Sequence, residues 1–584
     1  MSLNPQAIAS SWLADYGAAF ATHDLDTLTA LFLPDGWLRD LLVFTWNNHS
    51  LEGREKIKAF LLPTLSGAQV SGFKLDESAH LAPRTSVIPQ IQATDIELAY
   101  TFECLRGPGR GYVRLLADTD GKYKALAVLM MLSDLRGHEE IRTLHLRGEV
   151  GSAGHNTQKE FADWVEQVET NPYVLIVGAA QTGLQVAACF KQMGLSALVI
   201  ERTPRVGDVW RKRYPSLALH TPRRQHTLLY QSYPDNWPLY TPRDKVANWL
   251  EQYASVQDLV IWTSAELQPR PKYDAEKREW DVTIIREGKE YNVRPAHIIM
   301  ATGTLGAPNV PKVPGEDIFK GRLLHSVEYN GPEEFAGKRV VVIGAGNTAI
   351  DVCQDLALTG VGEVTMVQRS STCVMGRDFM TELLKDVFPE DVPMAVSDLR
   401  NGAMPYGLLK KLNILAQPYM WEAQKQLHDK LRKAGIQLNM GPDGAGLFFL
   451  VLGRFGGQDK GGADLIADGR IKVKHGVEID HLAENSVVFT DGSELPADVV
   501  VLATGYLSMK ETNRTLLGED IVDKTGGLYG LDEEGELKSS YRPAGHPGLW
   551  YATGDFFQGR FMSKILGLQL KARQLGLVEP RVEL

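Results

Sequence analysis

The stretch VGAAQTG, residues 177–183, lies where a dinucleotide-binding glycine loop would be. The apolar run YVLIV precedes it, and the helix-like LQVAACFKQMGL follows it. Such a strand–loop–helix unit lets backbone N–H groups at a helix N-terminus approach a pyrophosphate closely. The middle position of the loop, where glycine is usual, is Ala180, which adds one methyl group. The loop alone therefore leaves two interpretations open, a nucleotide site or an ordinary turn.

An acidic residue downstream favours the nucleotide site. The next predicted strand, SALVIE, ends in Glu201, 23 residues after Gly178. A carboxylate at this place accepts hydrogen bonds from ribose hydroxyls in dinucleotide folds. We therefore predict a dinucleotide site that tolerates the alanine. Its predicted residues are Gly178, Ala180, Gly183, Glu201 and Arg202.

The same strand–loop–helix–strand order recurs at 339–369. The strand KRVVVIG leads into the loop GAGNTA, and the next strand, EVTMVQ, ends in Arg369-Ser370 instead of an acid. An acid would repel a 2′-phosphate, whereas an arginine beside a hydroxyl can bind it. We therefore predict NADPH here, against the alternative of an ordinary surface arginine. The predicted binding residues are Gly344, Gly346, Asn347, Thr348, Ala349, Arg369 and Ser370.

Composition excludes several other classes of protein. The net charge of −10 argues against a general nucleic-acid binder. The four cysteines are far apart and form no CxxC pair, which argues against a disulfide framework, a metal site and a dithiol redox centre. No apolar run approaches the ~18 residues of a membrane span, and the start shows no signal peptide. We predict a cytoplasmic, soluble protein.

Residues 1–150 differ from the rest of the chain. Trp12, Tyr16 and Phe20 fall four apart, the spacing of one helix face, and a second helix is predicted to end at the Pro-Asp-Gly turn at 34–36. Strand-like runs such as DIELAYTFECL follow. This order predicts an α+β cone, and it resembles the SnoaL-like, nuclear-transport-factor-like fold.

Two roles are open for this cone. Asp40, His49 and Glu103 are polar residues that could face a cavity in its mouth. The interpretation we favour is a dimerisation or lid domain beside the main site, since a fold alone does not decide function. A homodimer is accordingly one expected assembly.

Between the two dinucleotide units stands FKGRLLHSVEY, residues 319–329. It matches the fingerprint of the class B flavin-containing monooxygenases, which residues 171–584 resemble. Phe319, Gly321, His325 and Tyr329 fill its fixed places. Baeyer–Villiger relatives carry Trp at the last position, so Tyr329 favours the branch that oxidises heteroatoms. The resemblance implies FAD in the first fold and NADPH in the second.

Further segments resemble this family. RVGDVWRKRYPSL resembles the segment after the first ribose acid, MATG and LATGY resemble the two ATG segments, and YATGDFFQGR carries an aspartate that bonds the ribityl chain in such flavoproteins. Each ATG segment alone is also compatible with a plain strand-to-helix turn. The residues that the resemblance adds to the cofactor sites are Gly207, Asp208, Trp210, Thr302, Gly303, Thr504, Gly505 and Asp555.

One segment departs from the family pattern. Where relatives usually have TNxPK, this chain reads LHTPR, so His220 takes the place of an asparagine that contacts flavin and nicotinamide. A histidine can hydrogen-bond there and can also act as an acid or base. We predict His220 as the catalytic residue, with a simply packed histidine as the alternative.

The resemblance also implies the reaction. NADPH would reduce FAD, and the reduced flavin would react with molecular oxygen to give a hydroperoxyflavin that oxygenates a small organic substrate at N or S. The closest subgroups are the dimethylaniline monooxygenase-like enzymes and the indole-3-pyruvate monooxygenase-like enzymes, in which a 2-oxo acid is decarboxylated. The alternatives are Baeyer–Villiger oxygenation of a ketone, a quinone reductase, and an NADPH oxidase or redox sensor.

The predicted fold class is therefore multidomain, an α+β cone followed by a two-dinucleotide-binding α/β flavoprotein fold of the Rossmann type. The predicted parts are a cone at 1–150, a linker at 151–170, a first FAD segment at 171–335, an NADPH domain with a helical insertion at 336–485, and a second FAD segment at 486–584.

Overall fold

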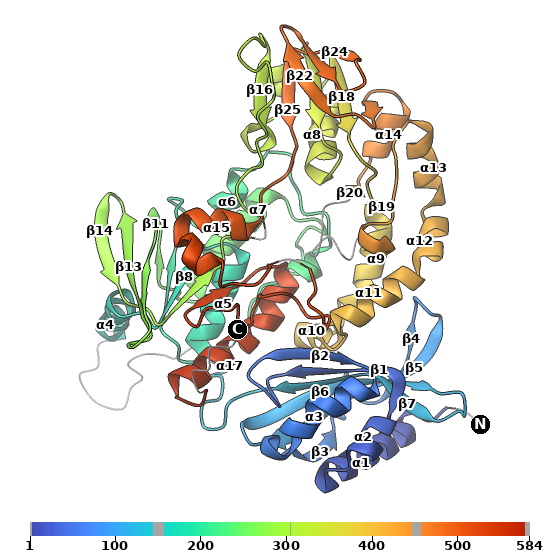
Figure 1. Ribbon diagram of the computed structural model, residues 1–584, viewed down its shortest axis with the longest axis vertical. Coiled ribbons are helices and arrows are strands. Elements are labelled where there is room, and N and C mark those ends of the chain that lie inside the picture. Colours follow the sequence, from blue (N-terminus) through green and yellow to red (C-terminus); the bar gives the residue numbers. More distant parts are fainter. Residues whose placement is uncertain (1–2, 144–156, 304, 447–456, 529, 579–584) are drawn as a thin grey trace.

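The computed structural model describes residues 3–143, 157–303, 305–446, 457–528 and 530–578. It has an N-terminal α+β domain, two parallel-sheet domains and a set of helices inserted in the second of these (Figure 1). In the view of Figure 1 the N-terminal domain lies at the bottom, and the inserted helices run up one side toward the second parallel sheet.

The N-terminal domain is a seven-stranded sheet with the path β2-β1-β7-β6-β5-β3, in which β4 also pairs with β5. Strands β1 and β7 are parallel, and the other pairs are antiparallel. Its helices are α1 (Pro5–Thr22), α2 (Leu25–Ala30) and α3 (Arg54–Ala68). Its strands are β1 (Phe32–Leu41), β2 (Asn48–Glu52), β3 (Ser71–Leu75), β4 (Arg84–Ile88), β5 (Ala93–Cys104), β6 (Gly107–Ala117) and β7 (Tyr123–Leu132).

Aromatic side chains fill the space between the helices and this sheet. Trp12, Tyr16 and Phe20 share the buried face of α1, as their spacing predicts. Tyr16 packs against Phe73 and Tyr100 from the sheet. The predicted turn at 34–36 is wrong, because α2 already ends at Ala30 and these residues form an irregularity inside β1.

Asp40 is fully buried in this domain. It lies opposite His49 in the β1–β2 register, whereas Glu103 is at the surface, paired with Arg136 at 2.9 Å. Burial raises the pKa of Asp40 to about 6, although His49, Arg106 and the N–H groups of Val43 and Phe44 act in the opposite direction. The three polar residues suggested for a cone cavity therefore do not form one site.

We expect Asp40→Asn to stabilise the protein at pH 7.5 by about 1–3 kcal/mol. The raised pKa means that the folded state holds a proton that the unfolded chain releases near pH 4, so the parent loses stability as the pH rises from about 4 to about 6. Unfolding midpoints at several pH values would show this loss in the parent and not in the variant. A variant that is less stable at pH 7.5 would contradict the argument.

The first parallel sheet has the order β10-β9-β8-β15-β26. Its strands are β8 (Val174–Val177), β9 (Ala197–Ile200), β10 (Ile261–Trp262), β15 (His297–Met300) and β26 (Leu549–Tyr551). The associated helices are α4 (Thr157–Thr170), α5 (Gln181–Gln192), α6 (Asp208–Arg211), η1 (Arg223–His226), α7 (Arg243–Val256), α15 (Met509–Leu517), α16 (Glu519–Val522) and α17 (Phe556–Gln574). A small antiparallel sheet adds β11 (Ala265–Leu267), β12 (Lys272–Asp274), β13 (Glu279–Arg286) and β14 (Lys289–Val293).

The second parallel sheet has the order β16-β25-β17-β18-β21. Its strands are β16 (Arg322–His325), β17 (Arg339–Ile343), β18 (Glu363–Gln368), β21 (Lys472–His475) and β25 (Val499–Leu502), and β22 (Ile479–Ala483), β23 (Ser486–Phe489) and β24 (Glu494–Pro496) form a separate antiparallel sheet. The helices η2 (Ser326–Glu328), η3 (Glu333–Phe335) and α8 (Asn347–Leu358) complete this part.

Between β18 and β21 the chain forms the inserted segment. It contains β19 (Val374–Gly376), α9 (Arg377–Val387), α10 (Met394–Gly402), α11 (Tyr406–Leu415), α12 (Gln417–Ala423), α13 (Lys425–Lys433), η4 (Pro442–Gly444), β20 (Gly457–Asp459) and α14 (Gly462–Ala467). None of the helices in the described part of the chain is long and apolar enough to cross a membrane.

Two predicted boundaries differ from the structure. The predicted linker at 151–170 contains helix α4 from Thr157, whose partly buried Trp164 packs against the first sheet domain. Strands β16 and β25 lie outside the predicted range 336–485 but pair within the second sheet. Sequence order hides this pairing because β25 returns to the sheet more than 130 residues after β18.

Candidate active site at the two glycine loops

The first glycine loop connects β8 to α5. Gly178 has a φ of 110°, and a Cβ there would lie 2.6 Å from the carbonyl oxygen of Ala301. A Cβ on Gly183 would lie 1.9 Å from the oxygen of Gly178. Gly178 therefore requires glycine for both conformation and space, whereas Gly183, inside α5, requires it for space.

Ala180 does not need to be glycine for its backbone. It is the N-cap of α5 with φ −92° and ψ −171°, an extended conformation that any residue adopts. In the second loop, Gly346 is the N-cap of α8 with nearly the same angles, φ −94° and ψ −174°. The alanine therefore sits in the backbone geometry that the second loop forms with glycine.

Glu201 follows β9 and turns back toward the glycine loop. Its carboxylate accepts hydrogen bonds from the N–H of Ala179 at 3.0 Å and from the N–H and hydroxyl of Thr203 at 2.9 and 2.8 Å. The carboxylate thus lies at the loop, as a ribose-binding acid must. Arg202 is exposed at the surface.

The segment at 207–210 packs beside the same loop. The indole N–H of Trp210 lies 3.4 Å from the side-chain oxygen of Gln181, the first residue of α5. Gly207 has a φ of 90° and approaches the carbonyl of Ala247 closely, so that a Cβ would be 2.4 Å from it. Asp208 forms an ion pair with Arg211 at 3.0 Å.

The second glycine loop connects β17 to α8 with the same close approach. Gly344 has a φ of 131°, and a Cβ there would lie 2.4 Å from the carbonyl oxygen of Ala503. Asn347 accepts a hydrogen bond from the N–H of Gln458 at 2.8 Å. Thr348 and Ala349 follow in the first turn of α8, and Ala349 is buried.

Arg369 and Ser370 lie just beyond the end of β18, and both are exposed. The Arg369 side chain is 65% exposed, and the nearest carboxylate of its ion pair, that of Glu478, is 3.7 Å away. The guanidinium is therefore accessible to a ligand. This position at the end of the second strand is the one that distinguishes a 2′-phosphate from a ribose hydroxyl.

The two ATG segments end the strands next to the loops. Ala301 and Ala503 supply the carbonyls that contact Gly178 and Gly344. Thr302 and Gly303 follow β15, and Gly303 has a φ of 103°. The Thr504 hydroxyl donates to the Asn309 carbonyl at 2.6 Å, and Gly505 has a φ of 80°.

The fingerprint residues belong to the second sheet domain. His325 ends β16, and its Nε2 lies 3.2 Å from the carbonyl oxygen of Gly505 in the second ATG segment. Tyr329 is buried and donates its hydroxyl to Asp355 on α8 at 2.9 Å. A Cβ on Gly321 would meet the ring of Phe319 and the carbonyl of Asp498. In this structure these four residues hold β16 against α8 and the ATG turn.

Asp555 caps helix α17 at the edge of the first sheet. Its Oδ1 accepts from the N–H of Gln558 at 3.0 Å, and its Oδ2 accepts from the amide of Gln225 at 3.0 Å. Burial raises the pKa of Asp555, while the hydrogen bonds and Arg560 lower it. Among the described residues, the side-chain oxygen of Gln225 and the hydroxyl of Tyr541 are buried here without a hydrogen-bond partner. These polar atoms fit a flavin with its ribityl hydroxyls beside Asp555.

A charged cluster connects the two nucleotide-binding parts. Asp351, a buried residue of α8, accepts a hydrogen bond from the Tyr214 hydroxyl at 2.7 Å. His220 Nε2 lies 3.3 Å from the same carboxylate, and Lys460 pairs with its other oxygen at 2.8 Å. Burial alone would raise the pKa of Asp351, but His220 and Lys460 outweigh it and lower that pKa. The cluster holds the loop that carries His220 on the second domain.

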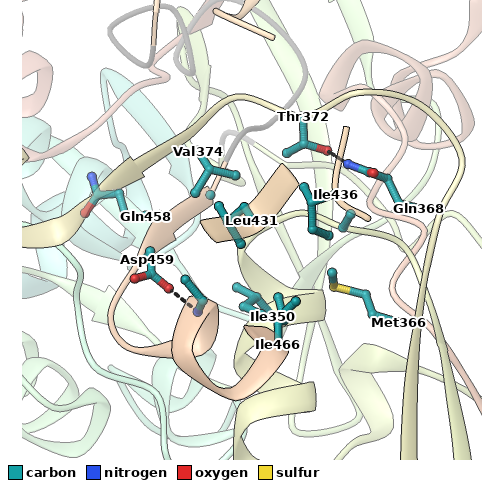
Figure 2. Close-up of a pocket in the computed structure, with 13 residues that line it drawn as sticks. Ile350, Met366, Gln368, Thr372, Val374, Leu431, Ile436, Gln458, Asp459 and Ile466 are labelled. Atoms are coloured by element: carbon teal, nitrogen blue, oxygen red, sulfur yellow. Dashed lines mark hydrogen bonds between the residues drawn. The ribbon is translucent and has the colours of Figure 1, made fainter. Parts of the chain in front are cut away.

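A pocket opens in the second domain beside its glycine loop (Figure 2). It lies between α8, β18, α13 and α14 and reaches the loop at Ala345. Apolar side chains such as Ile350, Leu431 and Ile436 form most of its wall. Gln368 donates to Thr372 at 3.2 Å at one end.

The predicted residues thus form three groups. One group surrounds the first loop, one surrounds the second loop, and His220 stands between them. Sequence reasoning missed Tyr214, Asp351, Lys460, Gln225 and Tyr541. For Asp351 the one available signal was an acidic residue within the helix that follows the second glycine loop. The other four residues belong to no local sequence pattern.

Two parallel sheets that each end in a glycine loop define a two-dinucleotide-binding oxidoreductase. A family described as flavin-binding monooxygenase-like matches residues 172–511, and the chain belongs to this family. It is therefore a flavin-dependent oxidoreductase of the monooxygenase class. The match begins after the N-terminal domain, whose resemblance to SnoaL-like folds stays a prediction.

Similar proteins include plant enzymes. Over 339 residues the chain is 32% identical to indole-3-pyruvate monooxygenase YUCCA1 of Oryza sativa subsp. japonica, covering 58% of this chain and 77% of that protein. It is 30% identical over 337 residues to the probable indole-3-pyruvate monooxygenase YUCCA9 of Arabidopsis thaliana, covering 57% and 75%. A cyclohexanone monooxygenase structure bound to epsilon-caprolactone aligns with a TM-score of 0.50 at 17% identity, covering 69% and 88%, which shows a shared fold.

Proposed function

We propose that this protein is an NADPH- and oxygen-dependent monooxygenase that oxygenates a small organic substrate at nitrogen or sulfur, or decarboxylates a 2-oxo acid. FAD would occupy the first loop, with Glu201 on its ribose and Asp555 at its ribityl chain. NADPH would occupy the second loop, with Arg369 and Ser370 on its 2′-phosphate. When bound, the flavin would accept a hydride and activate molecular oxygen.

The observation that carries this proposal is the matched construction of the two loops. In each loop, the first glycine packs closely against the carbonyl oxygen of the alanine in an ATG segment. A Cβ would lie 2.6 Å from that oxygen at Gly178 and 2.4 Å from it at Gly344. Each following helix begins at an extended N-cap, where free N–H groups favour a pyrophosphate. The contact of His220 with Asp351 then brings the first domain's loop onto the second domain's helix.

His220 would be the catalytic residue between the cofactors. In the neutral ring, an Nε2–H that donates to Asp351 leaves Nδ1 as an acceptor of a hydrogen bond. The pair can thus hold a proton at a defined atom while Tyr214 and Lys460 keep the carboxylate in place. Trp210, which packs on the start of α5, would exclude water from the flavin side.

The relatives favour the 2-oxo acid among the substrate classes, since two of them are named for indole-3-pyruvate. Tyr329 at the end of the fingerprint favours heteroatom oxidation over Baeyer–Villiger oxygenation. In this proposal the protein acts as a cytoplasmic enzyme and uses neither nucleic acid nor a membrane. A homodimer remains a prediction.

The test is oxygen uptake by the FAD-loaded protein with NADPH and a panel of amines, sulfides, 2-oxo acids and ketones. We expect one class to yield a product that contains oxygen from ¹⁸O₂, or a decarboxylated acid, in proportion to the NADPH consumed. A ketone converted to an ester would replace the proposal with Baeyer–Villiger chemistry. Hydrogen peroxide equal to the NADPH used, with every class, would indicate an oxidase or a sensor.

We expect Arg369→Ala to weaken the preference for NADPH selectively. The exposed guanidinium has only a loose ion pair with Glu478, so its removal takes away phosphate binding without leaving a buried charge. The KM for NADPH should rise about 10- to 100-fold, and the KM for NADH should change less than about twofold. Steady-state reduction of the flavin by both coenzymes measures this. An equal rise for both would contradict the assignment.

A further inference from the structure

The N-terminal domain is joined to the flavoprotein part by a buried interface. Trp37, on β1, packs against Gly407 and Gly535, and both glycines lie too close to this indole or to each other to carry a Cβ easily. Trp37 also shares an apolar cluster with Met404, Leu408 and Leu412 of the inserted helices. Lys564 of α17 pairs with Asp134 at 2.9 Å and with Glu140 at 2.6 Å. Figure 1 shows this domain beneath α10, α11 and α17.

At the centre of the interface is a fully buried ion pair. Arg39 donates to Glu536, 497 positions later, from Nε at 2.6 Å and from Nη2 at 2.9 Å. Both side chains are at most 2% exposed. Ser50 also donates to Glu536 at 2.6 Å, and Arg39 Nη1 donates to the carbonyl of Gly402. Such a charge is retained in a dry interface only where its partners satisfy it.

The same guanidinium stands over the ring of Tyr406, 5.0 Å from its centre. Tyr406 is buried at the start of α11. Burial raises the pKa of Tyr406 to about 12. The positive charge of Arg39 and a hydrogen bond with Gln558 lower this pKa, while the negative charge of Asp555 raises it. The tyrosine therefore lies between the N-terminal domain and the first turn of α17, where Asp555 is expected to meet the flavin.

Glu536 also begins a constrained segment. Ser539 and Tyr541 have φ angles of 53° and 57°, a left-handed conformation that such residues hold only when their surroundings impose it. Tyr541 N–H bonds to the Tyr551 carbonyl at 2.9 Å on one side, and Glu536 is bound by Arg39 on the other. Tyr541 is 0% exposed, lies near Asp555 and Tyr406, and has an unpartnered hydroxyl.

We propose that the N-terminal domain is part of the flavin site and that Arg39 is its positioning residue, which holds Tyr406 and the segment 536–541 against the start of α17. The Tyr541 hydroxyl, which has no partner among the described residues, is then a donor to the bound flavin. The inference rests on the proposed placement of the flavin at Asp555. It assigns a role within the site to the domain that lies outside the family match.

The experiment compares Arg39→Met with a matched control, Arg114→Met. Arg114 is a half-buried arginine of the same domain that pairs with Asp95 at 2.6 Å and Glu97 at 2.7 Å, and across the interface its guanidinium lies 3.9 Å from the Met404 sulfur. FAD is titrated into the full-length apoprotein by fluorescence, and the visible circular dichroism of the bound flavin is recorded. We expect Arg39→Met to raise the Kd for FAD at least about tenfold and to alter the dichroism. Arg114→Met should lower the unfolding midpoint but change the Kd less than about twofold.

Arg39→Lys restores the charge without the two-pronged bond, so it should recover part of the loss. If Arg39→Met does not fold, the same measurements on Tyr541→Phe test the proposal. It removes a hydroxyl that has no partner, so apoprotein stability should not fall, while the Kd for FAD should rise or the dichroism change. Unchanged FAD binding and dichroism in Arg39→Met, or in Tyr541→Phe, would overturn the proposal. These readouts measure cofactor binding, so a failure to form oxygenated product would count against the proposed function instead.

Discussion

Gly344→Ala is expected to reduce the rate of flavin reduction by NADPH about 100-fold while FAD stays bound. The backbone at this position has a φ of 131°, which disfavours any side chain, and the new methyl carbon would lie 2.4 Å from the Ala503 carbonyl oxygen. Either the loop or the ATG turn must move, and both shape the second dinucleotide site. Stopped-flow flavin bleaching with NADPH measures the rate.

The matched control is Gly360→Ala. This glycine also has a positive φ, 78°, and lies in the same domain, but nothing is within 4 Å of the added carbon. It therefore reports the conformational cost alone, about 1 kcal/mol in stability, with little effect on flavin reduction. A Gly344→Ala protein that NADPH reduces within about threefold of the parent rate would refute the placement of NADPH at this loop.

Asp351→Asn is expected to weaken the contacts between the two nucleotide-binding parts and to lower the free energy of unfolding. The carboxylate is the shared partner of Tyr214, His220 and Lys460, and its side chain is 1% exposed. Loss of its charge leaves the Lys460 ammonium, 17% exposed, without its ion pair, which costs about 3 kcal/mol. Denaturant unfolding followed by tryptophan and flavin fluorescence measures this loss. Flavin reduction by NADPH should slow at the same time, because the cluster sets the approach of the two domains.

Asp355→Asn is the control for this change. Asp355 lies one turn further along α8, and its carboxylate accepts a hydrogen bond from the Tyr329 hydroxyl of the same domain at 2.9 Å. An amide oxygen can accept that hydrogen bond, so the loss should stay below about 1 kcal/mol. Equal effects of the two substitutions would contradict a special role for Asp351.

The pH dependence of Asp351→Asn has a definite sign. Because the pKa of Asp351 is lowered in the folded protein, its stabilisation is complete above the ordinary carboxyl value, about 4, and is lost as the pH falls through the lower folded value. The stability difference between parent and variant should therefore be constant above about pH 5 and shrink below about pH 4. A difference that shrinks near neutral pH would assign the effect to another group.

Much of the candidate site was predictable because it depends on local backbone geometry. Gly178, Gly183 and Gly344 occupy positions where a Cβ collides with a neighbouring carbonyl, and glycine at those spacings is visible in the sequence. Ala180 fits the loop because its N-cap conformation is extended, which any residue can adopt. The aromatic face of α1 was predictable for the same local reason, the period of a helix.

Other features depend on contacts that no local pattern contains. The predicted end of α2 failed because a strand irregularity at 34–36 competes with a turn made from the same residues. The boundary at 485 failed because β25 completes a sheet begun far upstream. In the sequence, Asp351 looks like any other polar residue of a helix. Only the structure shows that three side chains from other segments contact its carboxylate.

By itself, the sequence determined that the chain has two strand–glycine-loop–helix units, that the second strand of the second unit ends in an arginine, and that the family fingerprint lies between the units. Each of these is a short-range property of strand, loop and helix. Only the tertiary structure decided where the N-terminal domain packs, because Arg39 and Glu536 are 497 positions apart and either residue alone would be taken for a surface charge. Their burial together makes them an ion pair that must be satisfied, and that requirement joins the domain to the segment that precedes β26 and α17.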